Sequence, residues 1–150
     1  MKAISLWQPW ASLWCSPAKV HETRHWPTSH RGWLAVHAAK RLEKDFGGEL
    51  EMILNAEFGH DWANILPCGA LVGMVDIVAC ERTEAIVRQL DWRDYHCGDF
   101  STFRYGWRRD EFIRFAEPVP YRGMQGIFNI SDELVPCAPK ERDGVSLLPL

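Results

Sequence analysis

The chain has 150 residues, of which 47% are hydrophobic and 25% are charged, and its formal net charge is −3 at pH 7. These values are typical of one folded domain with a single core, and the negative total argues against a protein that coats a polyanion with its whole surface. No apolar run approaches the roughly 20 residues that cross a bilayer, and the N-terminus lacks the apolar stretch of a signal peptide, so we expect a cytoplasmic protein.

The first elements of the chain are predicted to be short. A strand is expected over 2–7, followed by a helix over 10–14, because Pro9 fits the first turn of a helix. Residues 20–26 and 33–37 are then predicted as two further strands.

The middle of the chain favours one long helix and one central strand. Apolar residues recur at helical spacing within 43–58, where the two adjacent glycines weaken the start. The Val- and Ile-rich segment 69–79 predicts a strand, and 83–90 a short helix. Residues 91–105 are polar and aromatic, and we expect an irregular excursion there.

Two more strands are predicted near the C-terminus, over 105–115 and 126–130. Pro118 and Pro120 between them indicate a sheet edge or a turn. Short strands with a few helices between them predict an α+β domain, arranged as a small mixed β-barrel with flanking helices, over 1–130. Residues 131–150 lack periodicity and are predicted to form a tail.

The charges are unevenly distributed along the chain. Segment 15–42 has five basic residues and one acidic residue, whereas 43–61 has six acidic residues and one basic residue. Segment 102–122 has five arginines and three acidic residues. If the two basic segments share a face, they create a local anion-binding field; otherwise these charges only solvate the surface.

Lys19, Glu22 and Arg24 are the first candidate functional residues. On an extended strand Glu22 and Arg24 point to the same side, and Lys19 precedes them at a turn. A desolvated lysine next to a carboxylate can act as a base, and an arginine can bind a phosphate with two hydrogen bonds. The alternative is a set of surface ion pairs worth at most about 1 kcal/mol each.

The tryptophans and one amide are the next candidates. Eight tryptophans are many for this length, and Trp10 and Trp14 lie on one helix face, which usually belongs to the core. An exposed ring would stack on a base. Gln8, at a corner between strand and helix, can read the edge of a base or cap its own backbone.

A second polar-aromatic cluster lies in the segments 98–101 and 104–107, and it could close over the first. His37 ends a predicted strand and is interpreted as a hydrogen-bonded histidine of the core or its rim. Gln125, between two glycines, is a weak ligand candidate.

Neither a metal nor a cofactor is predicted. The sequence has no phosphate-binding glycine loop, dinucleotide fingerprint, zinc-protease or serine-hydrolase motif. Its five cysteines contain no C-x-x-C pair and are expected to be reduced and mostly buried: Cys15, Cys68, Cys80, Cys97 and Cys137.

An ordered set of motifs over residues 2–130 resembles the ASCH domain, the activating signal cointegrator homology domain. The motifs are ISLWQPWASL at 4–13, KVHETRHW at 19–26, RGWLAVHA at 31–38, GALVG at 69–73, YGW at 105–107 and EPVPYRGMQG at 117–126. The resemblance implies a PUA-like fold, a cleft lined by Lys19, Glu22 and Arg24, and a role near RNA.

The resemblance also implies two possible activities. One branch of the family hydrolyses N4-acetylcytidine with a lysine base and a threonine three residues later, but Glu22 occupies that position here. Another member is similar to a single-strand-specific ribonuclease, for which Ser101 or Tyr105 would supply the hydroxyl.

Three hypotheses follow from the sequence. The first is a module that binds single-stranded RNA or a modified nucleoside, with no membrane partner; its binding residues would be Gln8, Trp10, Arg24, Arg31, Arg104 and Tyr105. The second is a hydrolase of RNA phosphodiesters or N4-acylated cytidine, with Lys19 as base and Glu22 as its catalytic partner. The third is a protein-interaction domain that uses the acidic helix within 43–58.

Overall fold

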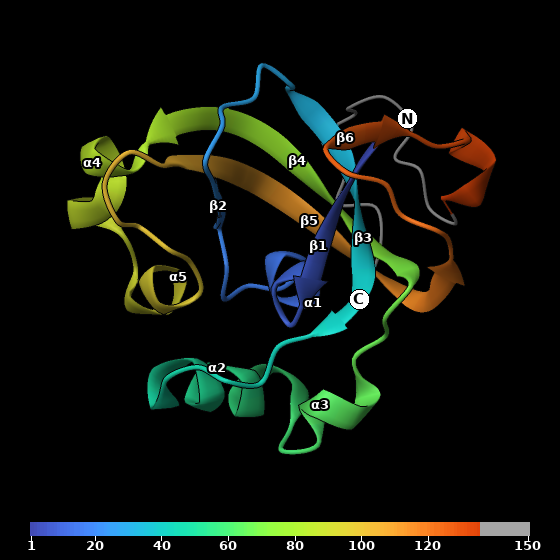
Figure 1. Ribbon diagram of the computed structural model, residues 1–150, viewed down its shortest axis with the longest axis horizontal. Coiled ribbons are helices and arrows are strands. Elements are labelled where there is room, and N and C mark those ends of the chain that lie inside the picture. The colour runs from blue at the N-terminus through green and yellow to red at the C-terminus, as the bar shows by residue number, and fades with distance from the viewer. Residues whose placement is uncertain (136–150) are drawn as a thin grey trace.

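A computed structural model describes residues 1–135 of the chain, and a six-stranded mixed sheet forms its frame (Figure 1). The strand order is β2-β5-β4-β3-β1-β6, in which only β1 and β3 run parallel. The strands are β1 (Lys2–Gln8), β2 (His21–Arg24), β3 (Gly32–Leu42), β4 (Ala70–Arg82), β5 (Tyr105–Pro120) and β6 (Ile127–Asn129).

Five short α-helices and two 3₁₀ turns cover the sheet in this part of the chain. They are α1 (Trp10–Trp14), α2 (Gly48–Phe58), α3 (Trp62–Ile65), α4 (Thr83–Ile86), η1 (Val87–Gln89), α5 (Trp92–His96) and η2 (Asp132–Leu134). None of these helices is long and apolar enough to cross a membrane.

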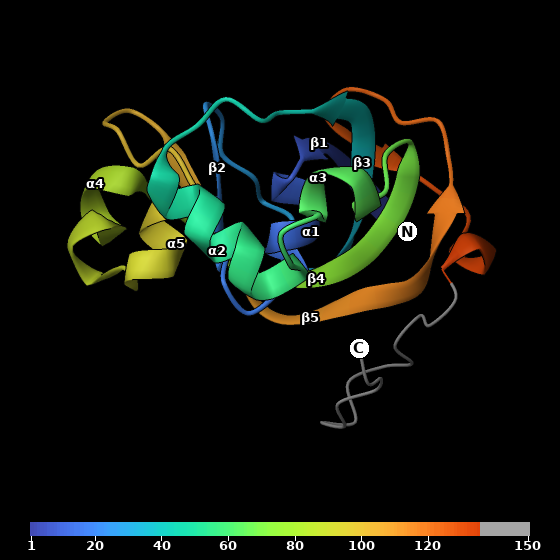
Figure 2. The ribbon, with the colours of Figure 1, turned by 90° about the horizontal axis from the view of Figure 1, so that it is seen from below.

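The sheet is curved but open. β4 and β5 bend around α1, as the two views show (Figures 1 and 2). The edge strands β2 and β6 pair with β5 and β1, not with each other. The α+β class is therefore confirmed, whereas the expected closed barrel is not.

Side chains alternate along β1, so this strand contributes to a core cluster on each face of the sheet. Ile4 and Leu6 pack with Trp14 of α1 and with Trp107 of β5, all fully or almost fully buried. Ala3 points the other way and packs with Phe128 of β6. A third cluster joins α1 to α2, α3 and Cys97 after α5, so α2 and α3 are connected to the sheet through α1.

Two expectations about local structure need correction. The segment 91–105, expected to be irregular, contains α5, whose first turn is capped because the Asp91 side chain accepts from the Arg93 N–H. β5 extends beyond 115 and includes Pro118 and Pro120, because only β4 pairs with that end while β2 pairs with residues 105–108. The prolines therefore lie at a local sheet edge, as one of the two readings predicted.

The first residues of the predicted tail pack on the domain. Val135 is buried in the cluster that contains Phe128, and Asp132 accepts a 2.7 Å hydrogen bond from the N-terminal amino group of Met1. The rest of the tail, 136–150, lies outside the described residues, so the boundary between domain and tail stays a prediction.

Candidate functional site

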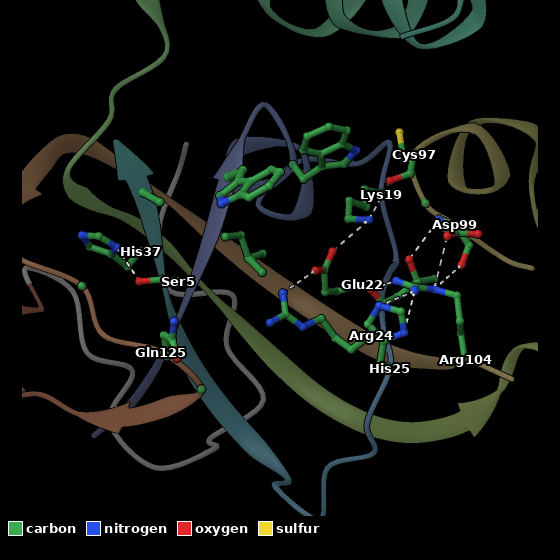
Figure 3. A pocket seen from close by; sticks show the side chains of 18 of the residues that line it. Ser5, Lys19, Glu22, Arg24, His25, His37, Cys97, Asp99, Arg104 and Gln125 are labelled. Carbon is green, nitrogen blue, oxygen red and sulfur yellow. Dashed lines mark hydrogen bonds and ion pairs between the residues drawn. The ribbon is translucent and has the colours of Figure 1, made fainter. Parts of the chain in front are cut away.

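A cavity of about 1560 Å³ opens between β1, β2, the start of α2 and two loops, 96–104 and 121–126. Figure 3 shows two groups of polar side chains in it. Lys19, Glu22, Arg24 and Arg104 lie at one end, which we call the charged end. Ser5, His37, Tyr121, Gly123 and Gln125 form the other, which we call the neutral end.

Lys19 is fully buried at the charged end, where both of its polar contacts are short. Its Nζ lies 3.2 Å from Oε1 of Glu22 and donates a 2.7 Å hydrogen bond to the carbonyl oxygen of Cys97. Because water no longer solvates this ammonium, the carboxylate and the carbonyl must replace it. The prediction that Lys19 and Glu22 meet is therefore confirmed.

Arg24 continues the row of charges toward solvent. Its Nη1 is 3.5 Å from Oε2 of Glu22, and its guanidinium lies 5.4 Å from the ring centroid of Trp26. The indole of Trp26 in turn packs edge-on against the buried Trp107. A carboxylate on one side and a ring on the other orient this guanidinium, whose side chain remains 28% exposed.

The turn that presents Lys19 is held by buried partners. Arg109 of β5 donates from Nε to the carbonyls of Trp14 and Lys19, and from Nη2 to that of Ser16. Burial lowers the pKa of this guanidinium from its ordinary value. One arginine thus fixes the chain between α1 and β2.

A second anchor holds the next residues of the same segment. The Asp94 carboxylate of α5 accepts from the N–H groups of Val20 and His21 and lies 2.7 Å from Nδ1 of His21. Burial opposes ionisation of Asp94, but these hydrogen bonds outweigh it and lower its pKa from the ordinary value. Sequence reasoning missed both anchors because nothing local marks which Arg or Asp will be buried.

The second predicted cluster lies beside the first. Arg104 donates to the carbonyls of Asp99 and Thr23, and its Nη1 is 3.1 Å from the ring of His25. Its Nε also lies 3.5 Å from the Asp99 carboxylate. Arg104 thus brings the second cluster beside the first, a placement that the sequence left open, and His25 joins the site together with Asp99 of that cluster.

Aromatic rings form part of the cavity wall. Trp7, Trp10 and Trp26 all line the cavity. Trp7 is 47% exposed and has the guanidinium of Arg41 3.9 Å from its ring centroid, while Trp10 packs edge-on against Phe46. Trp14 is fully buried and Trp10 is partly buried against the third core cluster, so the expectation that this pair belongs to the core holds fully for Trp14 and in part for Trp10.

His37 at the neutral end is hydrogen-bonded on both sides, as predicted. Its Nδ1 lies 2.7 Å from Oγ of Ser5, and its Nε2 lies 2.6 Å from the carbonyl oxygen of Tyr121. Burial lowers the pKa of His37 from its ordinary value, although the bond to Tyr121 works in the opposite direction. Gln125 also lines this end.

Three predicted binding residues lie outside the cavity lining. Gln8 is fully buried: its Nε2 donates to Oγ of Ser12 and to the carbonyl of Pro67, so it takes the backbone-bracing role that the sequence left open. Arg31 donates to carbonyls of its own loop. The ring of Tyr105 lies beneath the Arg82 guanidinium, 5.6 Å away.

The hydroxyl groups considered for nuclease chemistry are not at the charged end. Ser101 donates to the Asp99 carboxylate, and neither it nor Tyr105 lines the cavity. Within 1–135 the structure contains no group of three or more His, Cys, Asp or Glu side chains placed to hold a metal. The cysteines there are free thiols, two of them buried, and Cys137 lies outside the described residues.

Comparisons with known proteins place the chain in a family. The model of the ASCH domain matches residues 4–116. Human and mouse activating signal cointegrator 1 are each 38% identical over 81 residues, which are 51% of this chain but 14% of those proteins. The chain thus matches only a small part of the length of these relatives.

A solved structure agrees with the fold. The crystal structure of a mutant ASCH protein from Zymomonas mobilis matches 89% of this chain and 91% of its own, with a TM-score of 0.54 and 12% identity. At that identity the likeness concerns the fold alone. The family match spans most of the chain and includes the segment that presents Lys19, Glu22 and Arg24. The chain belongs to the ASCH domain family.

Proposed function

We propose that the cavity binds single-stranded RNA or a modified nucleoside. The observation that carries this proposal is the row of Lys19, Glu22 and Arg24 at the edge of an aromatic-walled cavity. Relatives named for a signal cointegrator do not specify a ligand, so the proposal relies on the chemistry of the cavity.

The electrostatics of the charged end favour an anion near Arg24 and Arg104. Glu22 is already paired with the buried Lys19, so the guanidinium of Arg24 keeps donors that face solvent. Arg104 and His25 lie beside it. A phosphate that binds these donors releases its counterions, and the binding is therefore salt-dependent.

The aromatic wall supplies the second part of the recognition. Trp7 of β1 and Trp10 of α1 line the same cavity as the charged row. A base that stacks on one indole gains about 1–3 kcal/mol without a requirement for sequence. Arg122 and Lys40 line the same cavity and add positive charge along a strand that leaves it.

Substitution of Arg24 tests this proposal, with Arg31 as the matched control. Arg24→Ala removes a guanidinium from the cavity and is expected to weaken binding of a labelled single-stranded RNA by at least about tenfold. It should also reduce the slope of log K against log salt by about one. Arg31→Ala removes the same charge outside the cavity and should change affinity about twofold or less.

Glu22→Gln completes the test, because it removes a negative charge with little change of shape. Binding that survives or tightens in this variant fits a phosphate near Arg24. Fluorescence anisotropy at several salt concentrations gives all three affinities. Equal losses in Arg24→Ala and Arg31→Ala, or no loss in either, would overturn the proposal.

A second candidate function is hydrolysis with Lys19 as the base. It is favoured by the 3.2 Å contact of Nζ with Glu22, because a carboxylate at that distance can exchange a proton with the amine. The substrates to test are N4-acylated cytidine and labelled single-stranded RNA. Turnover by the wild type that is lost in Glu22→Gln, while the circular dichroism spectrum is unchanged, would support this function; equal turnover in both proteins would exclude it.

A further inference from the structure

Ser5 and His37 form a hydrogen-bonded pair at the neutral end of the cavity, far from the charged row (Figure 3). The two residues are direct partners in the parallel register of β1 and β3. Parallel pairing places both side chains on one face, so the contact is set by the sheet itself. Rigid strands therefore hold the two groups, as a reactive pair requires.

The hydrogen bonds determine which nitrogen of His37 carries the proton. The carbonyl of Tyr121 can only accept, so the nitrogen 2.6 Å from it, Nε2, must be the donor. A neutral imidazole then has its lone pair on Nδ1, which lies 2.7 Å from Oγ of Ser5. Ser5 consequently donates its hydroxyl proton to Nδ1, which is the arrangement of a nucleophile and its base.

The third group of such a constellation is also in place. The Tyr121 carbonyl orients the imidazole from the far side, a role that a carboxylate often has. Because burial lowers the pKa of His37, the imidazole is neutral and able to accept a proton at pH 7. His37 itself is 2% exposed, whereas Ser5 is only partly buried and lines the cavity.

The loop 121–126 covers this pair closely. A methyl group on Gly123 would lie 2.2 Å from Oγ of Ser5 and 2.5 Å from Nδ1 of His37, so only glycine fits there. The close approach limits how far either side chain can turn away from the other. Gln125 lies at the same end in Figure 3 and offers an amide N–H group, a type of donor that stabilises an oxyanion.

We propose that Ser5 and His37 form an acyl-transfer site that cleaves a carboxylic ester bound in the cavity. Oγ of Ser5 bonds to the carbonyl carbon while its proton passes to Nδ1 of His37. The carbon–oxygen bond to the leaving group then breaks, and the alkoxide takes the proton from Nδ1. Water repeats both steps on the acyl-serine, which releases the acid and restores the hydroxyl.

This inference goes beyond the proposed RNA or nucleoside binding and does not depend on it. The hydrogen bonds of the pair join Ser5 to His37 and His37 to Tyr121, and they include neither Lys19 nor Arg24. An esterase without RNA binding and an RNA-binding protein without esterase activity are therefore distinct experimental results.

Covalent labelling tests the site with a fluorophosphonate probe and p-nitrophenyl acetate. Peptide mass spectrometry is expected to find the phosphonyl group on Ser5, and His37→Gln should slow labelling by at least about 100-fold. Ser29→Ala, an exposed serine outside the cavity, is the control and should leave the rate unchanged. Ester hydrolysis should fall in Ser5→Ala to the rate without protein.

A second variant keeps the test decisive if Ser5→Ala is unstable. Ser5→Cys retains size and places a thiol next to Nδ1, and alkylation of this cysteine by iodoacetamide is expected to slow by at least tenfold when His37→Gln is added. Labelling of a serine other than Ser5, absence of label, or an alkylation rate that is independent of His37 would each overturn the proposal.

Discussion

The two ends of the cavity differ in the charge of the polar groups that they bury. The charged end buries an ammonium and a carboxylate 3.2 Å apart, whereas the neutral end joins a hydroxyl, an imidazole and a carbonyl with no formal charge. Burial of charges costs several kcal/mol per ion, so the charged end needs the Cys97 carbonyl beside the ion pair, and Arg109 and Asp94 hold the backbone that presents it. The neutral end needs only close packing, which Gly123 permits.

This difference predicts which end fails more severely when one partner is removed. An ion that has lost its partner has no water to replace it, whereas a hydroxyl or imidazole loses one hydrogen bond of about 1 kcal/mol. Substitutions at the charged end should therefore destabilise the protein most. Those at the neutral end should change stability mainly by disturbing the close packing of side chains there.

The largest effect is expected for Lys19→Met. This change leaves the Glu22 carboxylate and the Cys97 carbonyl without their buried donor, and the free energy of unfolding should fall by about 3–5 kcal/mol. Urea denaturation followed by tryptophan fluorescence measures the loss. Removal of the carboxylate as well, in a Lys19→Met, Glu22→Leu double variant, should restore part of the stability.

Arg93→Met is the matched control for that prediction. Arg93 also pairs with carboxylates, Glu57 at 3.4 Å and Asp91 at 3.7 Å, but its side chain is 44% exposed. Water screens such pairs, so the expected loss is about 0–1 kcal/mol. Similar losses in the two variants would show that burial does not distinguish Lys19.

An intermediate effect is expected for Gly123→Ala. The new methyl group would overlap Oγ of Ser5 and the ring of His37, so the loop must move at a cost of about 1–3 kcal/mol. Gly48→Ala is the control: a methyl group there meets nothing within 4 Å, and the first turn of α2 should gain about 0.4–1 kcal/mol. A neutral or stabilising Gly123→Ala would contradict the close packing of the neutral end.

The smallest effect is a pH dependence of stability from His37. Its pKa is lowered in the folded state from the ordinary 6.5, so the unfolded chain binds a proton more readily. Stability from this residue is complete above about pH 6.5 and is lost as the pH falls toward the folded pKa. His37→Gln should flatten that slope by at most about one proton.

Asp94, beside the charged end, should affect the stability of the protein in a lower pH range than His37. Its pKa is lowered from 3.8, so its contribution is present above that pH and declines as the pH falls further, through the folded pKa. Melting temperatures measured from pH 8 to 3 separate the two groups, because His37→Gln changes only the upper part of the curve. A slope that is the same with and without His37 would contradict the neutral, buried imidazole.

The local sequence pattern was sufficient to predict most helices and strands and the charged end of the cavity. Glu22 and Arg24 share a face because strand side chains alternate, and Lys19 precedes them by one turn, so a short stretch of sequence contains the whole row. The helix α5 was missed because its five residues are too few for a hydrophobic period, and the cap at Asp91 is its main signal.

The family, the α+β class and the charged row were predictable from the sequence, because motifs, side-chain alternation and charge spacing are local properties of the chain. By contrast, the burial of Lys19, the inward turn of Gln8 and the contact of Ser5 with His37 beneath Gly123 depend on tertiary packing. These contacts join residues up to about 120 positions apart, and strand register and packing across the whole core set them. No periodicity along the chain encodes such a register, so the neutral end becomes visible only in the folded molecule.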